Sequence, residues 1–283
     1  MENNIIMTKR IKYLTNKDLL SEIHKSKATF CSFTDDEFNQ YDLIVPSLEK
    51  INIRTIAEAK RNRAVRLAKQ NHEAAVEAAG KKIPLKNFEI DYRKIKKDEV
   101  VFRVMTFEHV PEDLGRKKTK KTVADRHVKV NFPPFQHWKF DEKDNLICVG
   151  KSHWVGGMEN GYFDGKCGKA TDDLARMWMK LCDRYATRGN VRGYTYNDEM
   201  KGQAILQLAQ IGLQFDESKS NNPFAYYTAA VTNSFVRIIN IEKRNQNIRD
   251  DILEMNGMNP SWTRQNADRD NGDTAPRGEK KKS

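Results

Sequence analysis

Residues 222–247 carry side chains whose types and spacing suit the binding of a nucleic-acid strand. At helical spacing, one face of this stretch holds Tyr226, Ala230, Asn233, Arg237, Asn240 and Arg244. An aromatic ring can stack on an unpaired base, which contributes about 1 to 3 kcal/mol per base, while arginines beside it bind phosphates. The alternative is a half-buried surface tyrosine with arginines nearby, an arrangement found in many proteins that bind no nucleic acid.

A second face of the same stretch is apolar. Asn222 is a suitable N-cap and Pro223 suits a first helical turn, so we predict that a helix begins here. Its predicted core face comprises Phe224, Tyr227, Val231, Phe235 and Ile238. The adjacent Tyr226 and Tyr227 are therefore expected to face different surroundings.

The preceding predicted helix, residues 197–215, has an uncharged polar face. Its core face is expected to carry Met200, Ala204, Leu208, Ile211 and Phe215, and its second face Gln203, Gln207, Gln210 and Gln214. In a chain with 31% charged residues, a row of amides is typical of a protein-docking surface, because interface cores are depleted of charge. Glutamine is also a good helix former at exposed positions, so a plain solvent-facing row remains an equal alternative.

Three further helices are predicted from apolar spacing and capping residues. Residues 15–29 form one short helix, and residues 52–79 form a long one. The long helix has a weak alanine stripe among many arginines and lysines, which favours a solvated, salt-bridged surface helix over a nucleic-acid contact. The third begins at the N-cap Thr171 and places in the core Leu174, Met177, Trp178, Leu181 and Tyr185.

Residues 83–166 have the short β-branched and aromatic runs of strands. The runs are "VVFRVMTF", "HVKVNF" and "HWKFDEKDNLICVGKSHW", the last with a turn at Asp144 and Asn145. We therefore predict a small β-containing insert. Its basic loop "GRKKTKK", residues 115–121, suits contact with phosphate and equally suits a solvated surface.

The composition predicts a cytosolic protein with an affinity for polyanions. The 283 residues have a formal net charge of +11, which favours nucleic acid as a partner over a membrane surface. No apolar run approaches the length that a bilayer requires, and the first residues lack the layout of a signal peptide. The four cysteines are too scattered for a disulfide framework, so free thiols are expected.

Metal and enzyme chemistry receive little support from the sequence. Four potential ligands gather in the insert, namely His137, Cys148, His153 and Cys167, but they lack the close spacing of a zinc knuckle. We expect buried thiols and ordinary histidines there, with no metal and no cofactor. No phosphate-cradling glycine loop, metalloprotease helix or nucleophile elbow is present, so no enzyme is predicted.

Residues 194–244 hold three motifs, "DEM", "GLQFDESKSNNPFAYYT" and "NSFVRIINIEKR", in one continuous register. With these motifs the stretch resembles the core-polymerase-binding and minus-ten-reading segment of bacterial sigma factors. Within that group it most resembles the late-transcription sigma factors of T-even-type bacteriophages. The early "YLTNKDLLSEI" is similar to the first helix of that family.

The resemblance implies two surfaces. A polymerase-binding face on the 197–215 helix would dock on the clamp helices of the largest subunit of host core RNA polymerase, through Glu199, Gln203, Gln207 and Gln210. A promoter-DNA-binding set would capture a flipped base on Tyr226 and contact the DNA with Asn233, Arg237, Lys243 and Arg244. Flexible A/T-rich steps are the cheapest to open, so trapping an extruded base would drive melting.

The chain departs from the family at three places. Ala229 and Ala230 stand where ordinary sigma factors have a tryptophan pair, and nothing after Asn247 resembles a helix-turn-helix. The lysine-rich end is not the acidic, apolar tail that tethers the T-even factors to a sliding clamp. Whether a sliding clamp and a co-activator take part therefore stays open, as do the promoter bases and the purpose of the insert.

These observations combine into one expectation. The predicted fold is mainly α, with a sigma-factor-like helical module of residues 1–34 and 166–250. This module is interrupted by a mixed α/β insert of residues 35–165, which consists of a long helix followed by a small β-containing region. A disordered tail of residues 251–283 follows the module. The expected function is to direct host core RNA polymerase to phage late promoters with an A/T-rich minus-ten-like element and to help melt them, in the cytoplasm of the infected bacterial host. The alternative is a single-strand DNA- or RNA-binding protein without polymerase association.

Overall fold

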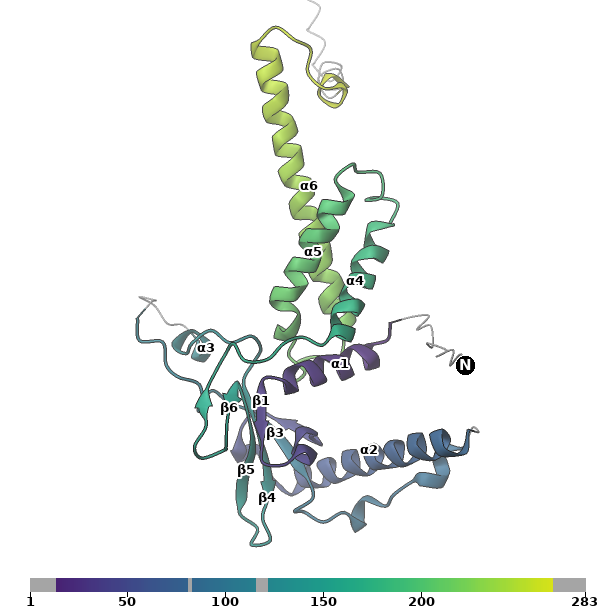
Figure 1. The fold of residues 1–283 in the computed structure, drawn as a ribbon, viewed down its shortest axis with the longest axis vertical. Helices are drawn as coiled ribbons and strands as arrows, with labels where there is room; N and C mark the ends of the chain where they lie inside the picture. The colour runs from purple at the N-terminus through teal and green to yellow at the C-terminus, as the bar shows by residue number, and fades with distance from the viewer. Residues whose placement is uncertain (1–13, 81–82, 116–121, 267–283) are drawn as a thin grey trace, which may run out of the picture.

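The computed structural model describes residues 14–80, 83–115 and 122–266. Figure 1 shows a group of helices stacked on a sheet, with one long helix projecting beyond the group at one end and a second long helix lying beside the sheet. Each part has its own cluster of buried apolar side chains.

The helical unit consists of α1 (Asn16–Ala28), α4 (Asp172–Ala186), α5 (Asn197–Ile211) and α6 (Pro223–Met255). Thr15 and Thr171 cap α1 and α4 with their side-chain oxygens, and Asn222 does the same for α6, which has proline in its first turn. The apolar faces of the four helices meet in a core that also receives Phe132 and Phe135 from the insert.

The sheet has five strands: β1 (Cys31–Phe33), β2 (Leu43–Val45), β3 (Val101–Met105), β4 (Phe135–Phe140) and β5 (Leu146–Ser152). Their order is β1-β5-β4-β3-β2; β2 and β3 are parallel, and the other pairs are antiparallel. A small hairpin pairs β6 (Trp154–Val155) with β7 (Tyr162–Phe163). The strand β1 follows α1 directly and already belongs to the sheet, although it lies within residues 1–34, which the sequence had assigned to the helical module.

The long helix α2 (Ile53–Ala79) packs on the sheet through small side chains. Ala59 and Ala64 are buried in a cluster with Phe102 and Val104 of β3. Short elements complete the part that the structure describes: α3 (Val123–Arg126), η1 (Asp36–Asn39), η2 (Leu48–Lys50), η3 (Leu85–Phe88), η4 (Tyr92–Lys94) and η5 (Gly212–Gln214).

The expected helices are present, and most of the predicted core faces are buried. Leu174, Met177, Trp178, Leu181 and Tyr185 are all buried, as are Met200, Ala204, Leu208 and Phe215, while Ile211 is half-buried. The predicted helix 197–215 ends earlier, at Ile211, where the chain tightens into η5. The hairpin of β4 and β5 also forms, with Asp144 at a left-handed φ of 63° in its turn.

Two local predictions are wrong. Residues 127–132 are not a strand, because His127 makes one isolated bridge to Glu112 and the residues after it join no sheet. Phe224 is 41% exposed instead of buried, since it lies in the first turn of α6, ahead of the buried Tyr227.

The fold is mixed α/β. About 53% of it is helical, and the sheet is a second layer with its own core, so the expected mainly α class describes the structure incompletely. The edge strands β1 and β2 were not recognised in the sequence, because they have only three residues each.

The stretch 251–266 is ordered, which corrects the expectation of a flexible tail from residue 251. The helix α6 continues to Met255, and the chain then folds back so that Ser261 donates hydrogen bonds from its amide and hydroxyl to Asp250, at 2.8 and 2.7 Å. Arg264 pairs with Asp251 at 2.6 Å. The remainder of the expected tail, residues 267–283, and the basic run 116–121 lie outside the described residues.

None of the helices in the described part of the chain combines the length and the apolar composition needed to cross a bilayer.

Candidate functional site

The two adjacent tyrosines at the start of α6 both bind the end of α5. The Tyr226 hydroxyl donates to the carbonyl of Ile211 at 3.0 Å, and the Tyr227 hydroxyl donates to the carbonyl of Gly212 at 2.9 Å. A helix leaves its last carbonyls without intrahelical partners, so these two bonds satisfy acceptors that the sharp turn after α5 would otherwise leave unpaired.

The surroundings of the two rings differ, as the sequence predicted. Tyr227 is fully buried and lies edge-on to Trp178, with ring centroids 5.9 Å apart. Tyr226 is half-buried and packs edge-on to Phe215 at 5.6 Å. Burial raises the pKa of both hydroxyls. Tyr226 therefore has the half-buried position that the sequence analysis gave as the alternative to a base-stacking tyrosine. To stack on a base, its ring would have to turn away from Phe215.

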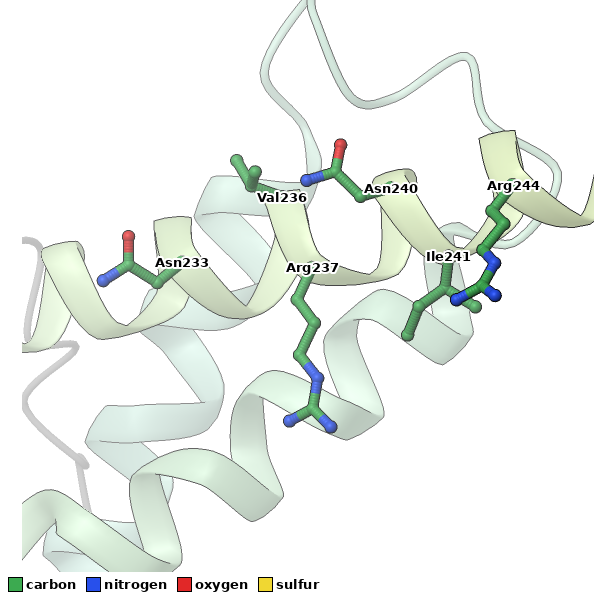
Figure 2. A pocket seen from close by; sticks show the side chains of 6 residues that line it. All are labelled: Asn233, Val236, Arg237, Asn240, Ile241 and Arg244. Carbon is green, nitrogen blue, oxygen red and sulfur yellow. The ribbon is translucent and has the colours of Figure 1, made fainter.

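The polar stripe of α6 lies on the surface beyond Tyr226. Asn233, Arg237, Asn240 and Arg244 are exposed, and together with Val236 and Ile241 they line a shallow groove along the helix (Figure 2). Figure 2 shows both arginines and Ile241 directed to one side of α6. Ala230, which the sequence placed on the same stripe, is buried and so separates Tyr226 from the groove.

The groove offers positive charge without a carboxylate partner. No ion pair among the described residues involves Arg237 or Arg244. Two guanidinium groups at two-turn spacing beside amide side chains can bind successive phosphates or the edge of a base. Lys243 is also exposed, but it does not line the groove.

The glutamine face of α5 is exposed. Glu199, Gln203, Gln210 and Gln214 are exposed and Gln207 is partly so, while Met200, Ala204 and Leu208 on the opposite face are buried. Leu206 lies within the exposed face at 57% exposure. The described part of the chain thus leaves a mostly uncharged helix surface with one apolar side chain open to a partner.

A buried ionic cluster that the sequence did not reveal joins the helical unit to the sheet. The Lys27 ammonium, from α1, donates to the Glu217 carboxylate at 2.8 Å and to the carbonyl of Phe215 at 2.7 Å. Arg103 of β3 lies 3.8 Å from the same carboxylate oxygen. Burial acts to raise the pKa of Glu217, but the charges of Lys27 and Arg103 outweigh it, so that pKa is lowered.

Arg103 is held by aromatic and histidine side chains as well. It is 1% exposed, its guanidinium lies 3.8 Å from the ring centroids of both Tyr41 and Phe135, and its Nε donates to His137 Nε2 at 3.0 Å. One sequence signal could have found this residue: an arginine in the middle of the apolar strand run "VVFRVM" must have a buried partner.

The four potential metal ligands of the insert have other contacts. His137 binds Arg103 and the carbonyl of Phe38, and the ring of His153 packs on Phe132 with centroids 4.2 Å apart. Cys148 is half-buried and donates to a nearby carbonyl, whereas Cys167 is exposed, so the expectation of a buried thiol is wrong for Cys167. Within the described residues, no three histidine, cysteine or acidic side chains gather as a metal-binding group.

Comparisons of the chain with protein-family models, with curated proteins and with solved structures found no match.

Proposed function

We propose that this protein is a sigma-like transcription initiation factor that directs host core RNA polymerase to phage late promoters and helps to melt them. The observation that carries the proposal is that α5 and α6, packed together, present two different open surfaces. One is the nearly uncharged face of Glu199, Gln203, Gln207 and Gln210, and the other is the basic groove of Asn233, Arg237 and Arg244.

The chemistry of each surface indicates which partner it would bind. A nearly uncharged helix face with an exposed leucine suits a protein partner, here the clamp helices of the polymerase, whereas the arginine groove suits promoter DNA. Lys243 would add a backbone contact beside the groove. The protein would form and stabilise a complex in the host cytoplasm, and the polymerase would catalyse the bond chemistry.

The half-buried position of Tyr226 implies that its ring must move during the proposed melting step. In the proposal, a base extruded from an A/T-rich element displaces the ring of Tyr226 from Phe215 and stacks on it, so melting includes a local rearrangement. Whether a sliding clamp or co-activator assists does not affect this step.

The proposal is tested by co-elution of the purified protein with host core polymerase at moderate salt. The Gln203→Glu, Gln207→Glu double variant should lose co-elution, because two charges would have to be desolvated in the interface. The matched control, Ala74→Glu, Ala78→Glu on the exposed side of α2, should retain it.

The alternative function makes the opposite prediction. A single-strand nucleic-acid-binding protein would not co-elute with polymerase under any of these conditions, but would bind single strands in a salt-sensitive manner through the α6 groove. Wild-type protein that binds single strands and never co-elutes would contradict the sigma-like function.

A further inference from the structure

Two of the cations on α2 form an inner group that is neutralised within the protein. Arg63 lies 3.3 Å from Glu37 and 3.8 Å from both Asp42 and Glu99. Arg66 lies 2.8 Å from Asp42. These two arginines therefore hold α2 on the sheet, in agreement with the salt-bridged helix that the sequence favoured.

The outer group has no such carboxylates. Arg61 is exposed on α2, and Arg93 and Lys94 are exposed on η4, which packs against α2. None of the three takes part in an ion pair within the described residues. The acidic residues of α2 are Glu58, Glu73 and Glu77. Next to η4 lies its N-cap Asp91, whose carboxylate accepts a hydrogen bond from the backbone amide of Arg93.

A tyrosine gathers two of these outer cations. The guanidinium carbons of Arg61 and Arg93 lie 5.1 and 5.9 Å from the ring centroid of Tyr92. Hydrogen bonding from Arg93, and then from Arg61, lowers the pKa of the Tyr92 hydroxyl. Two like charges beside one ring at the surface create a local positive potential that an external anion would relieve.

We infer that Arg61, Tyr92, Arg93 and Lys94 form a second nucleic-acid surface, one that binds the phosphodiester backbone without reading its sequence. Planar guanidinium groups bind phosphate oxygens through two donors at once, and the tyrosine ring keeps both groups in place. Three cations on adjoining elements suit successive phosphates of one strand.

The location of this surface separates it from the α6 groove. In Figure 1, α2 extends outward from one side of the sheet with residues 83–100 returning beside it, whereas α6 projects from the helical unit at the other end of the molecule. The inference does not depend on polymerase, so it can succeed or fail independently of the function proposed above.

The test is equilibrium binding of the full-length protein to a fluorescent duplex of arbitrary sequence, over a series of NaCl concentrations and without polymerase. The Arg61→Gln, Arg93→Gln variant should bind about tenfold or more weakly at roughly 0.1 M salt. The slope of log affinity against log salt should fall by about two, one for each lost phosphate contact.

A matched control has the same loss of charge elsewhere. Lys143 and Lys166 are exposed and make no ion pair within the described residues, so Lys143→Gln, Lys166→Gln should bind like the wild type. If the double arginine variant proves unstable, Arg93→Gln, Lys94→Gln alters η4 alone and should give the same reduction in slope.

Two results would overturn the inference. One is an arginine variant whose affinity and salt slope equal those of the lysine control. The other is sedimentation with phosphatidylserine vesicles that requires Arg61 and Arg93 while duplex binding does not, because the phosphate would then belong to a lipid surface.

Discussion

Tyr226 and Tyr227 are adjacent and chemically identical, and both of their hydroxyls donate to carbonyls at the end of α5. What distinguishes them is burial, since Tyr227 is fully buried beside Trp178 and Tyr226 is half-buried beside Phe215. A base-capturing role needs the Tyr226 ring, whereas the capping role needs its hydroxyl. The two roles can therefore be separated by substitution.

At the scale of this residue, the proposed function predicts that Tyr226→Phe retains promoter opening, because the ring is kept. The same substitution should lower the free energy of unfolding by about 1 kcal/mol, because it removes one hydrogen bond. Tyr226→Ala should reduce opening about 5- to 150-fold, the equivalent of roughly 1 to 3 kcal/mol of stacking. The measurement is permanganate reactivity of the melted bases in the polymerase complex. Co-elution with polymerase is the control for folding, and unchanged opening in Tyr226→Ala would refute base capture.

The junction between α5 and α6 depends on close approach of a backbone to an aromatic ring. A Cβ placed on Gly212 would overlap the Trp178 ring, and the Gly212 carbonyl accepts the hydrogen bond from Tyr227. By contrast, a Cβ on Gly202, in the middle of α5, would meet no atom within 4 Å. Replacing these two glycines by alanine should therefore have opposite effects on stability.

At the scale of this element, Gly212→Ala should destabilise the protein by about 1 to 3 kcal/mol, since Trp178 must move within a packed core. Gly202→Ala should instead stabilise it by roughly 0.5 to 1 kcal/mol, because alanine is the better helix former at an open position. Urea unfolding followed by circular dichroism measures both changes. Equal effects of the two substitutions would show that the Gly212 contact does not constrain the junction.

For the whole molecule, the ionic cluster of Lys27, Arg103 and Glu217 is a buried polar connection between the helical unit and the sheet. Its three residues come from α1, β3 and the loop after η5, and Glu217 lies in the "FDESKS" stretch that precedes α6. Removing one member of a buried ionic cluster is strongly destabilising, because the remaining charges are left buried without a partner. We therefore expect the insert and the helical unit to unfold together.

Glu217→Gln should lower the free energy of unfolding by about 3 to 5 kcal/mol in a single cooperative transition, because it leaves Lys27 and Arg103 without their carboxylate. Adding Lys27→Met should recover part of this loss, whereas Lys25→Met, at a 61% exposed side chain, should change stability by less than about 1 kcal/mol. Urea unfolding followed by both circular dichroism and tryptophan fluorescence is the measurement. Two separate transitions would contradict the coupling.

The stability of the folded protein should also depend on pH through the protonation of Glu217. Because the folded protein holds the pKa of Glu217 below its ordinary value, the unfolded chain binds a proton at this group more readily than the folded chain. The stabilisation is complete above the unfolded pKa of 4.5 and is lost as the pH falls through the lowered folded pKa. In Glu217→Gln this component of the acid dependence should be absent.

The sequence by itself determined the elements whose signals are local. Apolar spacing and capping residues were sufficient for α1, α2, α4, α5 and α6, and Asp144 with Asn145 was sufficient for the turn between β4 and β5. The same spacing separated the polar face of α6 from its buried face, because a helix fixes which residues point together.

The tertiary structure alone decided the contacts between residues far apart in the chain. Periodicity cannot reveal that Lys27 meets Glu217, that Arg103 is enclosed by Tyr41 and Phe135, or that Tyr226 turns back to α5. Three-residue edge strands carry too short a pattern to be recognised, and they form because β5 and β3 offer hydrogen-bonding partners. Local pattern therefore fixed which faces exist, and long-range packing decided which of them remain open to a partner.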